Sequence, residues 1–313
     1  MAEAPDRLGV VVMAYGTPAS PDDIEAYYTH IRRGRPPEPA QLAALAARYE
    51  AIGGTSPLAE RTEAQRQALA DALQARRPDG TRVVLGQKHA APFIEDAVAA
   101  LADDGIRRVV GLVLAPHWSK ASVGEYLSRL SAAAQARGMA AAGVESWHLE
   151  PAYLGFLAGA VDEARRTLPV RTKVLFTAHS LPERVLVDDP YPEQLRESAA
   201  AVAAMVGLDR WAGWSLCWQS AGATPEPWRG PDVLEVIRDL AATGRADGVL
   251  VCPQGFVSDH LEVRYDLDVE ARRVAEEVGL AFARTRVLND DASTFAALAD
   301  RVLALDPAGG GQR

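Results

Sequence analysis

Two segments far apart in the chain carry side chains suited to metal and proton chemistry. His179 directly follows the apolar run Val174–Ala178, and a row of acidic residues extends from Asp259 to Glu270. An imidazole at the end of a strand is a fixed group that titrates near neutral pH. Carboxylates are hard oxygen ligands for metal ions and also accept protons. Together these segments predict a site that handles a divalent metal ion and protons.

The acidic row fits two kinds of secondary structure. Apolar and charged residues alternate between Leu261 and Val269, which is a strand pattern. As a strand, the segment would place four acids on one side: Glu262, Asp266, Asp268 and Glu270. As a helix, it would stack three of these acids at intervals of four residues, and a strongly helical run follows it. A solvated surface face is the alternative to a functional site, and the row alone leaves both possibilities open.

Composition excludes several classes of protein. The 313 residues are 48% hydrophobic and 24% charged, which is typical of a globular protein. The net charge of -9 argues against binding to nucleic acid, which usually requires a basic face. No apolar run approaches the roughly 18 residues of a membrane span. Since the first residues have neither a basic start nor an apolar signal core, we expect a cytoplasmic protein.

Cofactor motifs are also missing. Cys217 and Cys252 each lie in an apolar run, so buried, unreactive thiols are the favoured interpretation. Two cysteines cannot hold a cluster that needs four thiolates, and we therefore expect no iron–sulfur cluster. The first predicted strand leads into Ala14–Pro18 rather than a glycine-rich phosphate loop, and the chain has no G-x-S-x-G nucleophile motif.

Apolar runs alternate with helical patterns along the whole chain. We predict eight strands: Leu8–Ala14, Arg82–Gly86, Arg108–Leu114, Gly143–Trp147, Thr172–Thr177, Trp211–Trp218, Gly248–Cys252 and Leu280–Arg284. Continuous apolar strands separated by helices are typical of parallel sheets covered on both faces. We therefore expect an α/β protein with two four-stranded halves that meet near Glu150.

A long stretch of helix and loop separates the first two predicted strands. It contains Arg32, Arg48, Tyr49, two adjacent glycines and Ser56. Long insertions after the carboxyl end of a strand often build ligand sites. Arginine pairs with carboxylates, tyrosine stacks, and glycine permits close approach, so the stretch would suit a flat anionic ligand. An ordinary basic surface helix is the alternative interpretation.

His179 is the only histidine that we assign to the predicted site. A structural hydrogen-bonding role is the favoured interpretation for the other five: His30, His89, His117, His148 and His260.

Segments in order over nearly the whole chain match one known pattern: Val12–Pro18, Tyr28–Arg35, Arg48–Gly54, Pro92–Val98, Ala178–Glu183, Trp218–Ser220 and Gly255–Glu262. On these segments the chain resembles the ferrochelatase family, and is most similar to its bacterial coproporphyrin branch. The resemblance implies two chelatase-like, Rossmann-like domains, 1–150 and 151–290, each with a four-stranded parallel sheet flanked by helices and with the porphyrin cleft between them. It implies that the acidic row is a locally widened helix and that a last helix at 291–306 returns to the first domain. The glycine run within 307–313 separately predicts a disordered tail.

The resemblance also implies roles for individual residues. His179 and Glu262 match the metal-site pair of the family, and Asp266 and Glu270 match acids along a path for metal ions or protons. Tyr15 matches a residue that can ligate the iron of the product, and tyrosine there favours the coproporphyrin branch. Six residues match porphyrin contacts: Tyr15, Arg32, Arg48, Tyr49, Ser56 and Tyr126.

The implied activity is that of a lyase-class chelatase of heme biosynthesis. It would insert Fe²⁺ into coproporphyrin III, giving coproheme and releasing two protons, with no cofactor beyond the substrate iron. The resemblance further implies a monomer that passes coproheme to a decarboxylase by transient contact. Three alternatives remain open: a protoporphyrin IX ferrochelatase, a cobalt chelatase and a non-enzymatic tetrapyrrole carrier.

Overall fold

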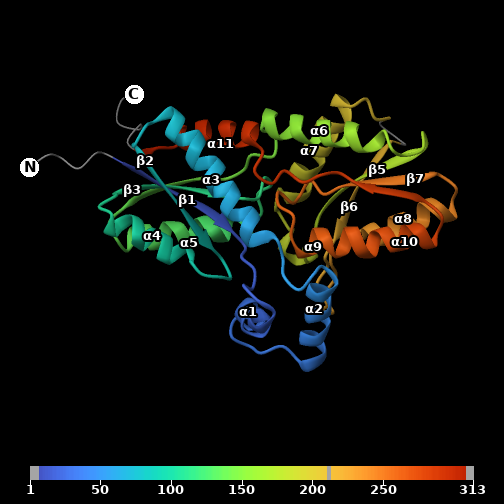
Figure 1. The fold of residues 1–313 in the computed structure, drawn as a ribbon, viewed down its shortest axis with the longest axis horizontal. Coiled ribbons are helices and arrows are strands. Elements are labelled where there is room, and N and C mark those ends of the chain that lie inside the picture. Colours follow the sequence, from blue (N-terminus) through green and yellow to red (C-terminus); the bar gives the residue numbers. More distant parts are fainter. Residues whose placement is uncertain (1–6, 210–212, 308–313) are drawn as a thin grey trace, which may run out of the picture. The chain divides into compact units, whose positions relative to one another are not determined.

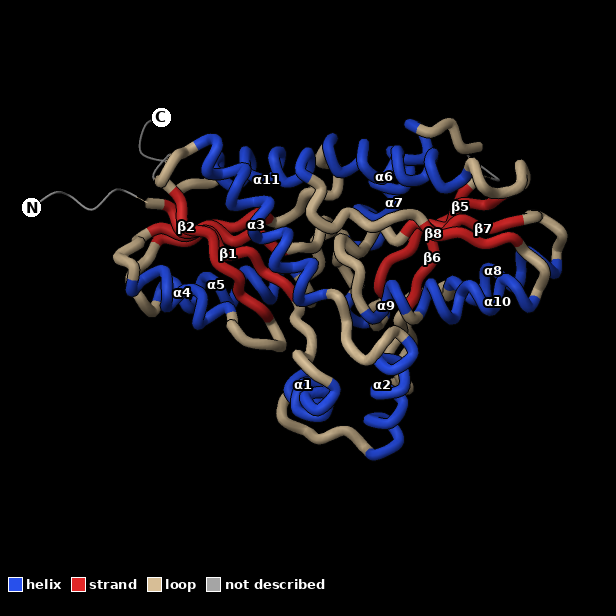
Figure 2. Tube along the Cα trace, in the orientation of Figure 1, coloured by secondary structure: helices blue, strands red, loops and turns tan. Residues whose placement is uncertain are grey.

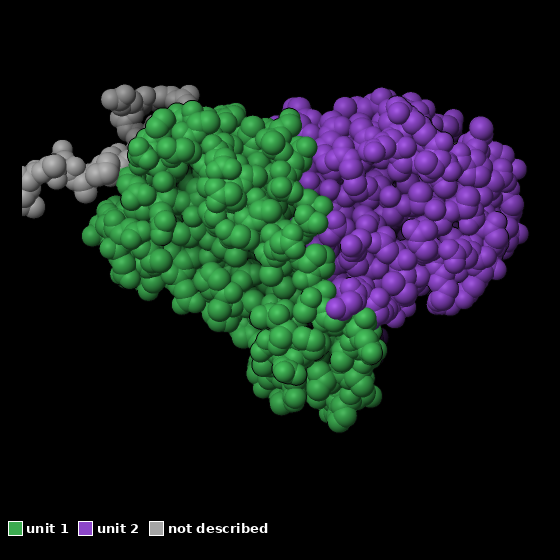
Figure 3. All heavy atoms as spheres, in the orientation of Figure 1, with its two compact units in different colours: residues 1–50, 54–147, 289–313 green, residues 51–53, 148–288 purple. Residues whose placement is uncertain are grey.

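The computed structural model describes residues 7–209 and 213–307. The chain forms two compact units, which Figure 3 colours separately: residues 1–50, 54–147 and 289–313 form unit 1, and residues 51–53 and 148–288 form unit 2. The predicted boundary near Glu150 lies close to the division after Trp147. The predicted disordered tail lies outside the described residues except for Pro307, and so does Trp211, where the sixth strand was expected to begin.

Unit 1 is built on a parallel sheet with the strand order β2-β1-β3-β4. Its strands are β1 (Leu8–Ala14), β2 (Thr81–Gln87), β3 (Arg108–Val113) and β4 (Ala140–Val144). All seven residues of β1 are buried, as expected for a central strand covered on both faces. The fourth strand begins three residues earlier than the predicted Gly143, because pairing with β3 recruits alanines whose own preference for strands is weak.

Helices cover both faces of this sheet (Figure 1). Helices α4 (Ile94–Asp103) and α5 (Val123–Gln135) lie on one face, and α3 (Leu58–Arg76) and α11 (Ala292–Ala304) lie on the other. Between β1 and β2 the chain also forms a short 3₁₀ turn, η1 (Pro21–Asp23), and the helices α1 (Ile24–Ile31) and α2 (Pro39–Ala51). These elements and α3 form the long insertion that the sequence predicts.

Unit 2 repeats the topology with the strand order β6-β5-β7-β8. Its strands are β5 (Thr172–His179), β6 (Trp214–Gln219), β7 (Gly248–Cys252) and β8 (Ala281–Arg284). One face carries α6 (Pro151–Arg165) and α7 (Tyr191–Met205), and the other carries α8 (Val233–Ala242) and α10 (Arg272–Glu277), as Figure 2 shows. The prediction of an α/β protein with two four-stranded parallel sheets is confirmed. No helix within the described ranges is both long and apolar enough to cross a membrane.

The last helix belongs to unit 1 although it follows unit 2 in the chain. Helix α11 packs against α3, and Asp306, just beyond its end, contacts two arginines of unit 1. Its carboxylate lies 2.9 Å from Nη1 of Arg77 and also accepts a hydrogen bond from Nη1 of Arg108. The side chains of Asp306 and Arg108 are only 13% and 12% exposed, so this contact is largely shielded from water.

We expect Asp306→Ala to lower the free energy of unfolding by about 2–4 kcal/mol, because it leaves two arginines without their shared carboxylate. Asp300→Ala is the matched control. Asp300 lies in α11 and pairs with Arg76 of α3, but it is 64% exposed, and its loss should cost less than about 1 kcal/mol. Urea unfolding of the three proteins measures both effects, and equal destabilisation by the two variants would contradict the prediction.

Candidate active site

The carboxyl ends of the unit 2 strands bring the candidate residues together. His179 is the last residue of β5, and Gln219 is the last residue of its neighbour β6. On the other side of β5, β7 ends at Cys252, and the chain then runs through a loop to the acidic row. Parallel strands end at one edge of a sheet, which is where open α/β folds place their ligands.

The acidic row is helical, so the strand interpretation is wrong. The row comprises α9 (Leu261–Arg264) and the π-helical segment η3 (Asp266–Ala271), which continues into α10. The amide of Glu270 donates to the carbonyl of Tyr265, five residues back, at 2.9 Å. Alternation of apolar and charged residues misled because Leu267 and Ala271, four residues apart, are the buried apolar positions of this segment. This geometry matches the locally widened helix that the family resemblance implies.

The widened turn also affects how the acids align. In an α-helix of about 3.6 residues per turn, a step of four residues drifts by roughly 40° around the axis. The wider π turn reduces this drift, so that Glu262, Asp266 and Glu270 remain closer to one line along the helix. Asp268 does not belong to that line. Its carboxylate instead forms a two-pronged ion pair with Arg284, so the expectation of four acids on one side was wrong.

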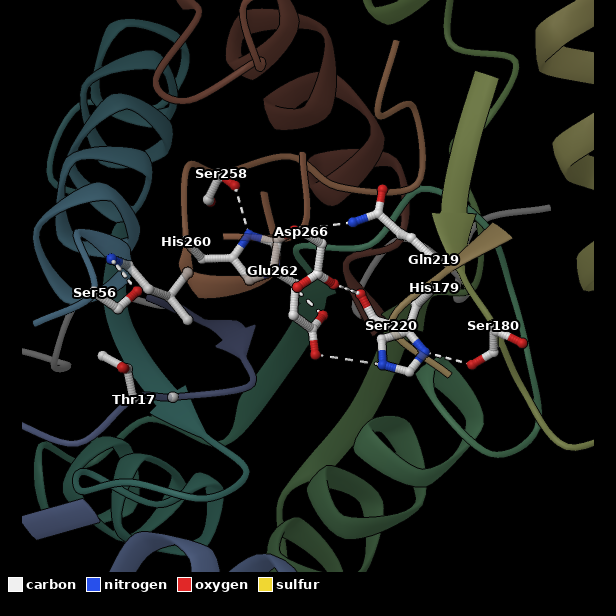
Figure 4. Close-up of polar contacts among 12 residues, drawn as sticks. Thr17, Ser56, His179, Ser180, Gln219, Ser220, Ser258, His260, Glu262 and Asp266 are labelled. Atoms are coloured by element: carbon white, nitrogen blue, oxygen red, sulfur yellow. Dashed lines mark hydrogen bonds and ion pairs between the residues drawn. The ribbon is translucent and has the colours of Figure 1, made fainter. Parts of the chain in front are cut away.

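His179 and Glu262 form the central pair of this site, and Figure 4 shows the two side chains facing each other. Nε2 of His179 lies 3.5 Å from Oε1 of Glu262. Nδ1 of His179 donates to the carbonyl of Ser180. Because both ring nitrogens face acceptors, the geometry favours the doubly protonated imidazolium.

The pKa of His179 follows from its neighbours. Burial alone would lower it, but the charge of Glu262 and hydrogen bonds to Glu262 and Ser180 raise the pKa of His179 to about 9. Burial would likewise raise the pKa of Glu262, but His179 and His260 hold it well below its ordinary value. At neutral pH without metal, the pair therefore consists of a cation and an anion.

His260 is a residue of this site that the sequence analysis missed. Its Nε2 lies 3.5 Å from Oε2 of Glu262, and its Nδ1 lies 3.0 Å from the carbonyl oxygen of Ser258. One carboxylate thus contacts two imidazoles (Figure 4). His260 is the residue immediately before α9, and the signal that could have identified it is its position two residues before Glu262.

The end of β6 holds two of the acids in place. Nε2 of Gln219 donates to the backbone carbonyl of Glu262 at 2.9 Å, and the hydroxyl of Ser220 donates to the carboxylate of Asp266. Ser220 has a φ of 61°, a left-handed conformation that a residue with a side chain rarely adopts. Asp266 is only 6% exposed, whereas Glu270 is partly exposed. Neither Gln219 nor Ser220 had been assigned a role from sequence.

The other predicted site residues lie in unit 1. Tyr15 directly follows β1 and is 44% exposed. Its ring packs against His89 with 4.6 Å between centroids, and Nδ1 of His89 lies 3.1 Å from Nδ1 of His30. Burial, together with the charges of Lys88 and nearby groups, lowers the pKa of His89 to about 3, so this imidazole is neutral. Tyr15 therefore presents an accessible ring supported by an uncharged histidine.

Arg32 and Ser56, two of the residues predicted to contact the porphyrin, lie next to helix ends. Arg32 directly follows α1, and its guanidinium lies 5.7 Å from the ring centre of Tyr28. The hydroxyl of Ser56 accepts a hydrogen bond from the amide of Leu58 at 3.2 Å, which helps to begin α3. Each side chain therefore has a defined local position.

The other three residues predicted to contact the porphyrin lie within helices. Arg48 and Tyr49 lie in α2, and the hydroxyl of Tyr49 is 3.5 Å from Oγ1 of Thr17. Tyr126 lies in α5 and is 5% exposed, with Nζ of Lys88 5.4 Å from its ring centre. Tyr49 and Tyr126 are both buried.

Metal ligands supplied by the protein alone are few. Within the described part of the chain, no group of three or more His, Cys, Asp or Glu side chains is arranged to hold a metal ion. Cys217 and Cys252 are buried free thiols, and burial raises the pKa of both. The His179–Glu262 pair could therefore offer a metal ion two ligands, with the remaining ligands coming from elsewhere.

Comparison with known proteins shows the family of this chain. The family model described as Ferrochelatase matches residues 7–305. The chain belongs to the ferrochelatase family. The coproporphyrin III ferrochelatase of Geobacillus kaustophilus is 44% identical over 302 residues, which cover 94% of this chain and 95% of that protein. The coproporphyrin III ferrochelatase of Bacillus subtilis is also 44% identical, over 95% of this chain and 97% of that protein.

Solved structures support the fold. SirB from Bacillus subtilis with Fe³⁺ has a TM-score of 0.57 at 11% identity, covering 98% of each chain. CbiX, a siroheme biosynthesis enzyme of denitrifying bacteria, has a TM-score of 0.52 at 15% identity, covering 95% of this chain and 98% of that one. At these identities the likeness concerns the fold alone, and it confirms the predicted chelatase-like architecture.

The raised pKa of His179 depends on the charge of Glu262. We expect an apparent pKa of about 9 for His179 in the metal-free protein, and a value near or below its ordinary 6.5 in Glu262→Gln, where burial is no longer offset. Since folding raises this pKa, protonation of His179 stabilises the protein fully below about pH 6.5, and this contribution is lost as the pH rises through about 9. NMR titration of the imidazole measures the shift.

Glu197→Gln is the control for this titration, because Glu197 pairs with His148 at 2.8 Å instead of with His179. It should leave the titration of His179 unchanged. A His179 pKa that stays near 9 in Glu262→Gln would show that another group holds the proton.

Proposed function

We propose that this protein inserts Fe²⁺ into coproporphyrin III, forming coproheme and releasing two protons. The observation that carries the proposal is the strand-end imidazole 3.5 Å from a carboxylate, in a chain that belongs to the ferrochelatase family. The choice of coproporphyrin rests on relatives that carry that substrate in their names and share 44% of their residues with this chain. Tyr15 supports the same choice through the family resemblance.

Insertion requires that Fe²⁺ lose water and that two pyrrole nitrogens lose their protons. Without metal, the proton on Nε2 of His179 occupies the place next to Glu262 where a cation would bind. An arriving Fe²⁺ competes with this proton, because only the neutral imidazole can ligate a metal. Binding of iron therefore displaces a proton, and the carboxylate of Glu262 compensates the charge of either cation.

Transfer of the iron to the ring reverses this exchange. Once Fe²⁺ has left, His179 is a neutral base beside a carboxylate, with a pKa near 9. Such a group accepts a pyrrole proton favourably at neutral pH. The same pair thus delivers the metal ion and then collects one of the two protons, and a bent ring would expose the nitrogen lone pairs to both steps.

Asp266 and Glu270 would connect this pair with solvent. Asp266 is buried and held by Ser220, and Glu270 follows it on the widened helix and is partly exposed. Carboxylates in a row can pass a divalent cation inward and protons outward, since each holds either species weakly.

The ring itself carries four negatively charged carboxylates, whereas the protein has a net charge of -9. Local positive charge must therefore attract this ligand. Arg32 and Arg48 in unit 1 would pair with its carboxylates, and the hydroxyls of Tyr49, Ser56 and Tyr126 would donate hydrogen bonds to them. Tyr15, with its exposed ring, would ligate the iron of the product.

The proposal needs no cofactor beyond the substrate iron, and we expect no iron–sulfur cluster. We further propose a cytoplasmic monomer that passes coproheme to a decarboxylase through transient contact.

The deciding experiment is anaerobic incubation of the purified protein with Fe²⁺ and either coproporphyrin III or protoporphyrin IX, followed by visible absorption. We expect the free-base bands to disappear faster with coproporphyrin III. Preference for protoporphyrin IX would overturn the substrate, and preference for Co²⁺ with a more reduced ring would indicate a cobalt chelatase. Ring binding without insertion would indicate a carrier.

Replacement of His179 tests the metal-site pair. We expect His179→Ala to lower the insertion rate by about 10²–10⁴-fold while the porphyrin still binds, because the ring is held by other residues. His148→Ala is the matched control, since His148 is also an imidazole paired with a glutamate in unit 2. Turnover retained in His179→Ala would exclude this assignment.

Replacement of Tyr15 tests the product ligand. We expect Tyr15→Met to keep much of the insertion rate and to change the visible spectrum of the ferric product, because the phenolate would no longer bind the iron. An unchanged spectrum would remove Tyr15 as a ligand.

A further inference from the structure

Arg284 contacts two acids that lie on either side of Glu262 in the sequence. Nε and Nη2 of Arg284 lie 2.7 Å and 3.0 Å from the two carboxylate oxygens of Asp268. Nη2 also lies 3.4 Å from Oδ1 of Asp259, and Nη1 donates to the carbonyl of Thr285 at 2.8 Å. All three guanidinium nitrogens are therefore engaged, and the side chain is only 11% exposed.

These contacts join two parts of the chain that differ in structure. Asp259 lies in the loop that follows β7, just before α9, whereas Asp268 lies within the π-helical segment η3. Short π segments have less favourable backbone geometry than an α-helix and depend on their surroundings. Arg284 is the last residue of β8, which pairs in parallel with β7. It therefore lies at the carboxyl ends of the strands, where β7 leads into the loop that contains Asp259.

Contacts from two different strands thus hold the segment that carries Glu262. Gln219 and Ser220, at the end of β6, hold the backbone of Glu262 and the carboxylate of Asp266. Arg284, at the end of β8, holds Asp259 and Asp268. β6 and β8 are the two outermost strands of this sheet, so the segment is attached at both of its sides.

We propose that Arg284 is a positioning residue, which keeps Glu262 within reach of His179 by holding Asp259 and Asp268 on one guanidinium. It also separates the acidic row into two groups. Asp259 and Asp268 share the single charge of Arg284, while Glu262, Asp266 and Glu270 remain for the metal ion and protons. This inference rests on the proposed iron insertion for its kinetic test, but not for its test by titration.

Contact with Asp259 and Asp268 at the same time requires the planar, forked guanidinium of an arginine. A planar guanidinium can meet one carboxylate with two parallel hydrogen bonds and still reach a second acid, whereas a lysine ammonium is a compact point charge. Loss of the cation would also remove the charge that Asp259 and Asp268 share, at 17% and 24% exposure, although Asp268 also lies 3.5 Å from Nη1 of Arg264. The two like charges would then repel each other and disturb the position of α9, which lies between them in the chain.

The test compares Arg284→Lys and Arg284→Gln with the wild type. We expect kcat to fall by about 10–100-fold in Arg284→Gln and by less in Arg284→Lys, because small displacements of a reacting group carry large costs. KM for coproporphyrin III should stay unchanged, since Arg284 is not among the residues proposed to hold the ring. The apparent pKa of His179, measured by NMR, should fall from about 9 toward 6.5 as Glu262 moves away.

Two further variants make the result specific. Arg273→Gln removes an exposed arginine that pairs with Glu277 along α10, and it should leave kcat and the His179 titration unchanged. Arg284→Gln combined with Asp268→Asn should be no slower than Arg284→Gln alone, because the two residues act through one contact.

The proposal would be overturned if folded Arg284→Gln kept both the kcat and the His179 titration of the wild type. It would also be overturned if kcat fell and KM for coproporphyrin III rose by similar factors. If Arg284→Gln does not fold, Arg284→Lys decides by the same criteria. If the wild type inserts no iron, the proposed function fails, but the shift in the His179 titration still supports or overturns the positioning role.

Discussion

The carboxylate of Glu262 is the group on which the candidate site depends. It lies 3.5 Å from His179 and 3.5 Å from His260, and it raises the pKa of His179 to about 9 despite partial burial. Removing a carboxylate from water is costly, and here two imidazoles compensate that cost. A positively charged neighbour therefore stabilises the Glu262 carboxylate, and in the metal-free protein His179 is that neighbour.

The fold supports this arrangement by bringing rigid strand ends to one edge of a sheet. His179 is placed by β5, Gln219 by β6 and Arg284 by β8, whereas Glu262 lies on a helix that no strand carries directly. A widened helix would be a weak support by itself. Contacts from β6 and β8 give it a fixed position, and so the precision of the site comes from the sheet more than from the helix.

Much of the fold could be predicted because buried parallel strands appear as continuous apolar runs. Leu8–Ala14 and Gly248–Cys252 match the observed β1 and β7 at both ends. The fourth strand was misplaced because Ala140–Ala142 gains its strand geometry from pairing with β3, which is a tertiary effect. His260 and Arg284 were missed for a related reason: their partners are set by the π turn and by the order of strands, and neither follows from local periodicity.

Helix α11 has a consequence for how the protein is made. It covers the face of the unit 1 sheet beside α3, yet it follows all of unit 2 in the chain. During synthesis from the N-terminus, unit 2 can complete its core as soon as its last strand has emerged from the ribosome. Unit 1 must wait with part of one apolar face uncovered until α11 and Asp306 have been added, so it is the last of the two units to finish folding.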